Sequence, residues 1–174
     1  MCYVDTYSSP LGAITLSSDG TSLTGCWFEG QRHFGKTLPS ETLSAECLQK
    51  PLAVFADAKR WLDEYFHGKE PPFLPLLSFA HKATAFEQKV WRVLLEIPYG
   101  TTGTYKDVAQ KVGGTTYCRA AAGAIGRNPI SLFVPCHRVI GSDGTLTGYA
   151  GGLDRKAWLL RLEAGTLLAD NRRA

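Results

Sequence analysis

A cysteine and a histidine stand side by side in the second half of this 174-residue chain. Cys136 and His137 lie in the apolar run 133–140, which we expect to be a strand. Pro135 precedes the pair and Arg138 follows it. The thiolate is the nucleophilic form of cysteine, and a nearby imidazole or cation favours it near neutral pH. The apolar flanks predict chemistry in a buried pocket, and the competing interpretation is an inert buried cysteine beside an incidental histidine.

A helix-turn-helix is expected before the pair. The capping-box sequence Thr84–Glu87 begins a first helix, and Pro98 ends it. Thr104 can cap a second helix that the glycines at 113–114 end, and a third helix is expected from about 116 to 126. Two short helices across a glycine-containing turn are typical of a helix-turn-helix.

Beyond the third helix we expect strand, turn, loop and helix in that order. The strand is expected at 130–134, and Asp143 with Gly144 predicts a hairpin turn. A glycine-rich loop at 148–152 then leads into a last helix from Leu153 to about Glu163. The second part of the chain should therefore be mainly helical.

The third helix is unusual because its side chains are almost all small. Between Cys118 and Gly126 the long polar side chain is that of Arg119. Helices that read base edges in the major groove carry polar side chains, whereas small residues let a backbone approach a surface closely. We therefore expect this helix to enter the minor groove of DNA, where an arginine could occupy the space of an extruded base. A helix packed tightly against its neighbours is the alternative.

The first part of the chain predicts an antiparallel meander followed by a helix. Strands are expected at 3–7, 13–16 and 23–28, separated by turn sequences. Apolar residues at helical spacing predict a helix that ends near Gly68. Its apolar positions are Leu52, Phe55, Leu62 and Phe66, with Trp61 and Tyr65 on an adjoining stripe.

We expect an α+β chain of two domains. The proline-rich stretch 71–75 cannot be a helix interior and is a suitable linker. It separates an N-terminal domain, 1–80, with a three-stranded antiparallel sheet and a helix, from a C-terminal helix-turn-helix domain, 81–174. A chain of 174 residues can form two small cores.

Composition and charge are ordinary overall but uneven along the chain. Hydrophobic residues make up 44% and charged residues 20%. No apolar segment approaches the length that spans a bilayer, and the N-terminus does not resemble a signal peptide, so we expect a cytoplasmic protein. The net charge is −2 over residues 1–84 and +5 over 85–174, which favours a polyanion-binding face in the second half. The cysteines are odd in number and are expected to be free thiols: Cys2, Cys26, Cys47, Cys118 and Cys136.

Several motifs of the second half occur in a fixed order: Tyr105, Arg119-Ala120, Asn128-Pro129, Val134 to Ile140, Gly148 to Gly152, and Glu163. With these spacings, residues 84–165 resemble the O6-alkylguanine-DNA alkyltransferases. The resemblance implies direct-reversal DNA repair, in which an alkyl group moves once from O6 of guanine in double-stranded DNA to a cysteine of the protein. It also implies a monomer without a cofactor, a ribonuclease-H-like N-terminal domain and a winged-helix-like C-terminal domain.

The same resemblance implies the roles of the catalytic residues. Cys136 is the alkyl acceptor, His137 the base that deprotonates it, and Glu163 the group that orients His137. Asn128 would brace the turn between the DNA-reading helix and the active-site strand, and Tyr105 would donate a proton to the leaving guanine. Because neighbouring side chains of a strand point to opposite faces, we expect a water to carry the proton between Cys136 and His137.

The resemblance further implies the surfaces that hold DNA and guanine. Arg119 would fill the vacated base stack, and Tyr105 would crowd the target phosphate. The small residues that would approach DNA are Ala120, Ala121 and Gly123, and the residues that would line the guanine pocket are Val139, Tyr149, Ala150 and Gly151. The chain has Ala121-Ala122 where the family more often has Val-Gly, and Cys118 where alanine is common. Each of these side chains is small, so DNA binding is still expected.

No metal is expected, although some family members bind zinc in the N-terminal domain. The candidate ligands are Cys2, Cys26, His33 and His81. Their spacing does not match a structural zinc pattern.

Two other functions remain open from the sequence. A cysteine-dependent hydrolase or acyltransferase would use the same Cys-His pair but would need an oxyanion hole and would turn over repeatedly. A non-catalytic module that binds damaged DNA would not need the acceptor cysteine, which this chain has.

Overall fold

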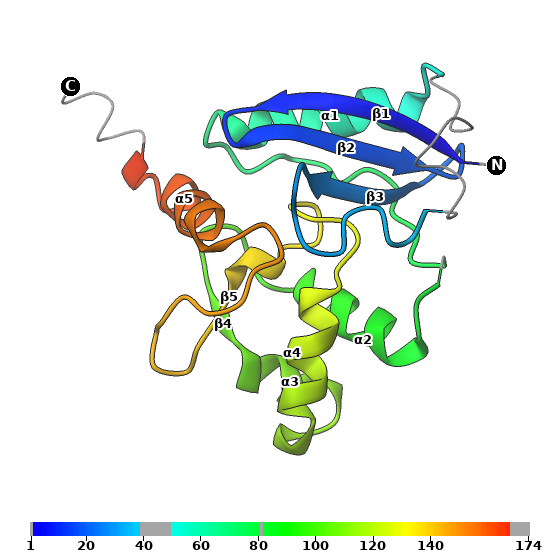
Figure 1. Ribbon diagram of the computed structural model, residues 1–174. Helices are drawn as coiled ribbons and strands as arrows, with labels where there is room; N and C mark the ends of the chain where they lie inside the picture. The colour runs from blue at the N-terminus through cyan, green and yellow to red at the C-terminus, as the bar shows by residue number, and fades with distance from the viewer. Residues whose placement is uncertain (1, 39–49, 81, 168–174) are drawn as a thin grey trace. The chain divides into compact units, whose positions relative to one another are not determined.

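The computed structural model describes residues 2–38, 50–80 and 82–167. The chain forms two compact units, one made of Met1–Lys82 with Pro129–Ser131 and the other of Ala83–Asn128 with Leu132–Ala174. Figure 1 labels the helices and strands of both. The expected α+β class is confirmed, with a three-stranded antiparallel sheet in the first unit and mainly helices in the second.

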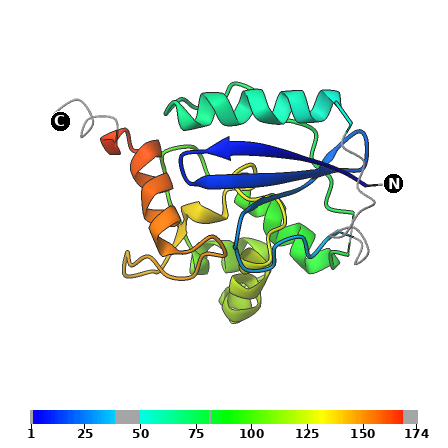
Figure 2. The ribbon, with the colours of Figure 1, turned by 45° about the horizontal axis from the view of Figure 1, so that its top comes forward.

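The sheet of the first unit contains strands β1 (Tyr3–Ser9), β2 (Gly12–Ser18) and β3 (Leu23–Phe28) in the order β1-β2-β3. Both strand pairs are antiparallel, so the predicted meander is confirmed. Helix α1 (Ala53–Phe66) contacts all three strands and lies along the sheet in Figure 2. The predicted stripe of Trp61 and Tyr65 belongs to its buried face.

Within its described residues the second unit contains the helices α2 (Ala85–Leu94), α3 (Tyr105–Val112), α4 (Cys118–Gly126) and α5 (Leu153–Glu163). The two-residue strands β4 (Gly103–Thr104) and β5 (Val139–Ile140) pair in parallel. The predicted helix starts are confirmed, because Thr84 with Glu87 and Thr104 with Asp107 both form complete capping boxes. A turn of 3₁₀ helix at Thr115–Tyr117 leads into α4.

The strand expected through the Cys-His region is confirmed only at its end, where Val139–Ile140 forms β5, and is wrong for the residues before Val139. Ile130 makes an isolated bridge to Cys26, but residues 131–138 form turns. Leu132 has a φ of 71°, and Cys136–Arg138 is a single turn of 3₁₀ helix. The run is apolar because it is buried, and a short apolar run cannot distinguish a buried strand from a buried turn.

The expected hairpin around Asp143 and Gly144 forms only in part. The Gly144 N–H donates to the Gly141 carbonyl at 2.9 Å, which closes a turn. Between this turn and the end of the described residues the chain contains α5 but no strand.

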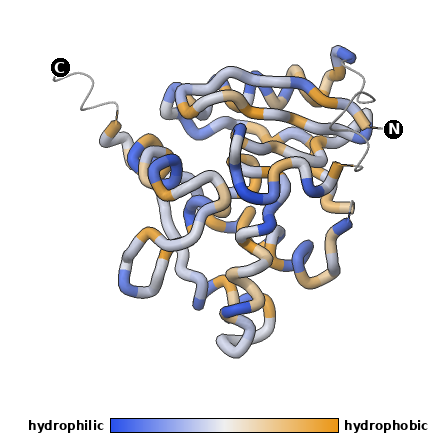
Figure 3. Tube along the Cα trace, viewed as in Figure 1, coloured by the Kyte–Doolittle hydropathy of each residue, from blue (hydrophilic) through white to orange (hydrophobic). Residues whose placement is uncertain are grey.

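Hydrophobic residues are spread along the helices and strands instead of being gathered into one long segment (Figure 3). No helix in the described part of the chain is long and apolar enough to cross a membrane.

Candidate active site

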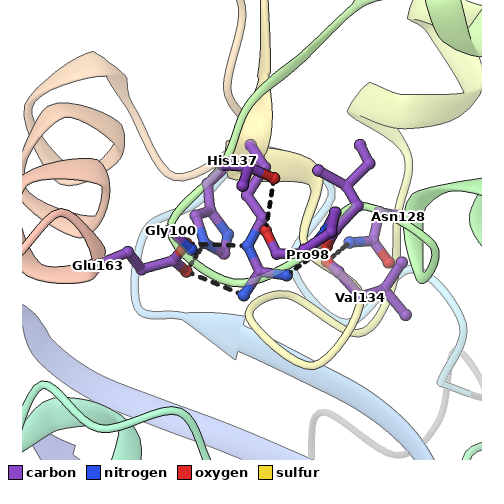
Figure 4. Close-up of polar contacts among 9 residues, drawn as sticks. Pro98, Gly100, Asn128, Val134, His137 and Glu163 are labelled. Atoms are coloured by element: carbon purple, nitrogen blue, oxygen red, sulfur yellow. Dashed lines mark hydrogen bonds and ion pairs between the residues drawn. The ribbon is translucent and has the colours of Figure 1, made fainter.

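The Cys136 thiol lies in the 3₁₀ turn and is only 4% exposed. The Nδ2 of Asn128, two residues beyond α4, donates to Sγ of Cys136 at 3.1 Å and to the Val134 carbonyl at 2.9 Å. Figure 4 shows the second of these bonds. One buried amide therefore holds both the Cys136 sulfur and the backbone that leads into the turn.

Burial raises the pKa of the Cys136 thiol, because a desolvated thiolate is unfavourable. The Asn128 hydrogen bond, the positive charge of Lys156, and backbone hydrogen bonds from Cys136 and His137 act in the opposite direction. The resting sulfur is therefore a protonated thiol near neutral pH, with several groups placed to stabilise a thiolate once a base removes the proton.

The candidate base is His137, which is completely buried and whose Nε2 lies 2.6 Å from Oε1 of Glu163 (Figure 4). Glu163 also accepts from the Arg138 Nε at 2.9 Å and from the Gly100 N–H at 3.1 Å. Burial alone would raise the pKa of Glu163, but the hydrogen bonds and charges of His137 and Arg138 bring it down to about 2. Glu163 is therefore an ionised group at the centre of a buried network.

Burial lowers the pKa of His137, although Glu163 acts to raise it. A neutral imidazole beside an ionised carboxylate must donate its Nε2–H to Glu163. Nδ1 of His137 then carries the lone pair that can accept a proton.

Cys136 and His137 do not form the hydrogen bond that a direct proton transfer would use. Among the described residues, the side chain that hydrogen-bonds to Sγ is Asn128. The two side chains were expected to point apart because they alternate along a strand. They point apart here because Cys136 and His137 are successive residues of a 3₁₀ turn, whose side chains lie about a third of a turn apart. The bridging water remains a prediction.

Tyr105 and Lys156 hold the loop that follows β5 through its backbone carbonyls. The Tyr105 hydroxyl donates to the carbonyls of Thr147 at 2.7 Å and Gly148 at 3.1 Å. Lys156, which is 0% exposed, donates to the same two carbonyls and to that of Val139. Its Nζ lies 5.8 Å from the centre of the Tyr105 ring. Tyr105 and Lys156 thus hold the carbonyls of Thr147 and Gly148 together, and Lys156 alone holds that of Val139, a residue expected to line the guanine pocket.

Neither the burial of Lys156 nor the pairing of Arg138 with Glu163 was predicted from the sequence. Burial lowers the pKa of Lys156 to about 8, while the nearby Cys136 acts to raise it. Lys156 and Glu163 are seven residues apart on α5, which places them on one face of the helix. From the sequence, this spacing could have indicated that Lys156 lies on the same side of the helix as Glu163.

Of the residues expected to line the guanine pocket, Val139 lies in β5 and the other three lie in the glycine-rich loop 148–152. Val139 and Gly151 are buried, and Tyr149 and Ala150 are half-buried. An open pocket of about 360 Å³ lies at the start of α5 and is lined by residues 151–155. Of the four residues expected to line the guanine pocket, Gly151 is the one that also lines this open pocket.

The expected DNA contacts of α4 do not all share its exposed face. Arg119 and Ala120 are exposed, and Gly123 is half-buried. Ala121 is completely buried, so its side chain faces the core of the unit and cannot contact DNA. Helical periodicity explains the difference, because 119, 120 and 123 share a face that 121 leaves.

The candidate metal ligands do not all fall within the described residues. Cys26 is buried in β3, while Cys2 is half-buried and His33 has a φ of 62°. His81 and Cys47 lie outside the described residues. No group of three metal-ligating side chains occurs among the residues that are described.

Family models match both parts of the chain. Residues 2–77 match the ribonuclease-like domain of 6-O-methylguanine DNA methyltransferase, and residues 85–165 match its DNA binding domain. The chain is also 42% identical over 166 residues to the methylated-DNA–protein-cysteine methyltransferase of Methanosarcina barkeri, covering 95% of this chain and 99% of that protein.

Solved structures agree with the sequence comparison. The crystal structure of the Mycobacterium tuberculosis O6-methylguanine methyltransferase has a TM-score of 0.80 and 40% identity, covering 95% of this chain and 94% of that chain. A structure titled as the Mycobacterium tuberculosis OGT in complex with DNA has a TM-score of 0.81 and 39% identity, covering 94% of both chains. The chain belongs to the 6-O-methylguanine DNA methyltransferase family.

Proposed function

We propose that this protein repairs double-stranded DNA by moving a methyl group from O6 of guanine to Sγ of Cys136. The observation that carries the proposal is the buried arrangement in which Asn128 donates to Sγ at 3.1 Å while His137 lies 2.6 Å from an ionised Glu163. This arrangement supplies a desolvated nucleophile, a base and a group that stabilises the protonated base. The similarity to the Methanosarcina barkeri methylated-DNA–protein-cysteine methyltransferase, which covers 95% of this chain, supports it.

The reaction is a substitution at the methyl carbon. Nδ1 of His137 accepts the thiol proton through a water, and Glu163 stabilises the imidazolium. A sulfur electron pair of Cys136 forms the S–C bond as the C–O6 bond breaks, and the electrons of that bond move to guanine. Tyr105 supplies a proton to the departing base, and the tyrosinate then regains a proton through water as the imidazolium of His137 releases one. The carbonyls held by Lys156 are groups that can accept hydrogen bonds from guanine.

The reaction should occur once per molecule. Its product is a thioether, which carries no good leaving group and cannot return to a thiol by proton transfer alone. The balance of atoms and electrons requires no cofactor. Transfer should therefore stop at one methyl per protein.

DNA contact is assigned to the exposed face of α4. Arg119 and Ala120 lie on this face, and the neighbouring glycine at 123 lets the backbone approach closely. We propose that α4 enters the minor groove, that the target base turns out of the stack, and that Arg119 fills its place. The proposed active form is a monomer in the cytoplasm.

The test counts turnovers on an oligonucleotide duplex with one O6-methylguanine. Excess duplex should lose one methyl per protein molecule, and Cys136→Ser should bind the duplex without repairing it. Many turnovers per molecule would instead identify a cysteine hydrolase. Repair by Cys136→Ser would refute the assignment of the acceptor.

A further inference from the structure

Helix α4 is attached to α2 at two points near its C-terminal end. The Nε of Arg127, the residue just after α4, lies 2.6 Å from Oε1 of Glu87 in the first turn of α2. One helical turn further along α2, the buried Trp91 donates its indole N–H to the Ala124 carbonyl at 2.9 Å. The end of α4 is therefore fixed, whereas its beginning carries the exposed Arg119.

The Glu87 carboxylate is held through both oxygens. Oε2 accepts from the backbone N–H of Thr84 at 2.9 Å and from its hydroxyl at 3.0 Å, while Oε1 pairs with Arg127. Burial would raise the pKa of Glu87, but these contacts lower it, so the carboxylate is ionised at neutral pH. The ionised Glu87 carboxylate thus links the start of α2 to the residue that follows α4.

The contact leads directly to the acceptor sulfur. Asn128 follows Arg127 in the chain, and its N–H donates to the Ile125 carbonyl at 3.2 Å as the helix ends. The Asn128 side chain then reaches Sγ of Cys136 at 3.1 Å. A change in the position of Arg127 would turn the adjoining peptide and change the direction in which the Asn128 amide points.

We propose that the Glu87–Arg127 ion pair is a positioning element of the methyl acceptor, which holds the Asn128 amide against Cys136 and thereby sets the reactivity of the sulfur. Neither member needs to contact DNA or guanine for this effect. The inference rests on the proposed function only in the identity of the acceptor. A hydrogen bond weakens steeply as its distance and angle change, so a small shift of Asn128 is sufficient to weaken its hydrogen bond to Sγ of Cys136.

The test measures the sulfur without DNA. Methyl iodide is a small methyl donor, and peptide mass spectrometry at pH 7 can follow S-methylation of Cys136, with Cys118 in the same sample as a reference. Glu87→Gln keeps a side chain that can complete the capping box but removes the ion pair. We expect Cys136 to react about three- to tenfold more slowly, the cost of weakening one hydrogen bond to a sulfur that becomes charged.

A matched control removes another ion pair of the same region. Glu96 pairs with Lys111 at 2.7 Å, and this pair joins the residues after α2 to α3 instead of to the end of α4. Glu96→Gln should leave the Cys136 rate unchanged. Arg127→Gln should slow the reaction as Glu87→Gln does, and Arg127→Lys, which keeps the charge, should restore most of the rate.

A double-mutant cycle separates positioning from general loosening of the fold. Asn128→Ala alone should slow Cys136, and adding Glu87→Gln to it should have no further effect. Equal rates for Glu87→Gln and wild type, or an equal additional loss in the Asn128→Ala background, would overturn the proposal. If Glu87→Gln does not fold, the rates of Arg127→Lys and Arg127→Gln decide. Repair of methylated duplex by the wild type is measured separately, so failure of the proposed function would be visible independently.

Discussion

Replacing Glu163 by glutamine removes a charge at the centre of the buried network while keeping its size. The carboxylate accepts from His137, from two nitrogens of Arg138 and from the Gly100 N–H. A neutral amide cannot satisfy all of these donors, and it leaves Arg138, which is 8% exposed, without a buried counter-charge. Both the free energy of unfolding and the rate of methyl transfer should therefore decrease.

The expected loss of stability follows from the pKa of Glu163, which lies at about 2 instead of 4.5. At about 1.36 kcal/mol per pH unit, this difference corresponds to about 3 kcal/mol at pH 7. Because the pKa is lowered in the folded protein, this stabilisation is present above pH 4.5 and disappears as the pH falls toward 2. The difference between wild type and Glu163→Gln should thus shrink by about half at pH 3.

The chemical effect arises from the tautomer of His137. An amide N–H in place of Oε1 would donate to Nε2, and the imidazole proton would then move to Nδ1. The lone pair that we propose accepts the Cys136 proton would be lost. Loss of a general base slows a reaction about a hundredfold or more.

Two assays test this prediction. Urea unfolding at pH 7 and pH 3 measures the stability difference, and single-turnover transfer from methylated duplex at pH 7 measures the rate. A stability difference that does not change with pH would contradict the ionised Glu163. Transfer within about twofold of wild type would contradict the role of His137 as the base.

Two further substitutions test the surfaces around the acceptor. Lys156→Met should slow methyl transfer about tenfold from both duplex and free O6-methylguanine, because the carbonyls that we propose accept hydrogen bonds from guanine lose their common donor; a loss seen with duplex alone would contradict a role in the base pocket. Arg119→Ala should slow repair of duplex by about tenfold or more but leave reaction with the free base unchanged, because only duplex requires extrusion of the base. Equal losses on both substrates, measured as single-turnover rates, would refute the function assigned to Arg119.

The sequence predicted best those features whose signals are local. The capping boxes at Thr84 and Thr104 place donor and acceptor three residues apart, so the starts of α2 and α3 could be predicted without tertiary information. The meander likewise follows from alternation and turn residues. The arrangement of Cys136, His137 and Glu163 was reached through the motif spacing of a known family.

The features that were missed depend on tertiary contacts. A lysine on a helix is usually exposed, and only the convergence of three carbonyls explains why Lys156 is buried. The region 130–138 was misjudged because Leu132 adopts a positive φ and the chain turns, although its composition suits a strand. Ala121 was placed on the DNA face because small residues give no indication of which side of a helix they occupy.

The most direct test of the central claim is mass spectrometry of the protein after reaction with duplex that contains O6-methylguanine. The account predicts one added methyl group per molecule, localised to Cys136, with unmethylated guanine appearing in equal amount. A methyl group on Cys118, or repaired guanine with an unmodified protein, would contradict it.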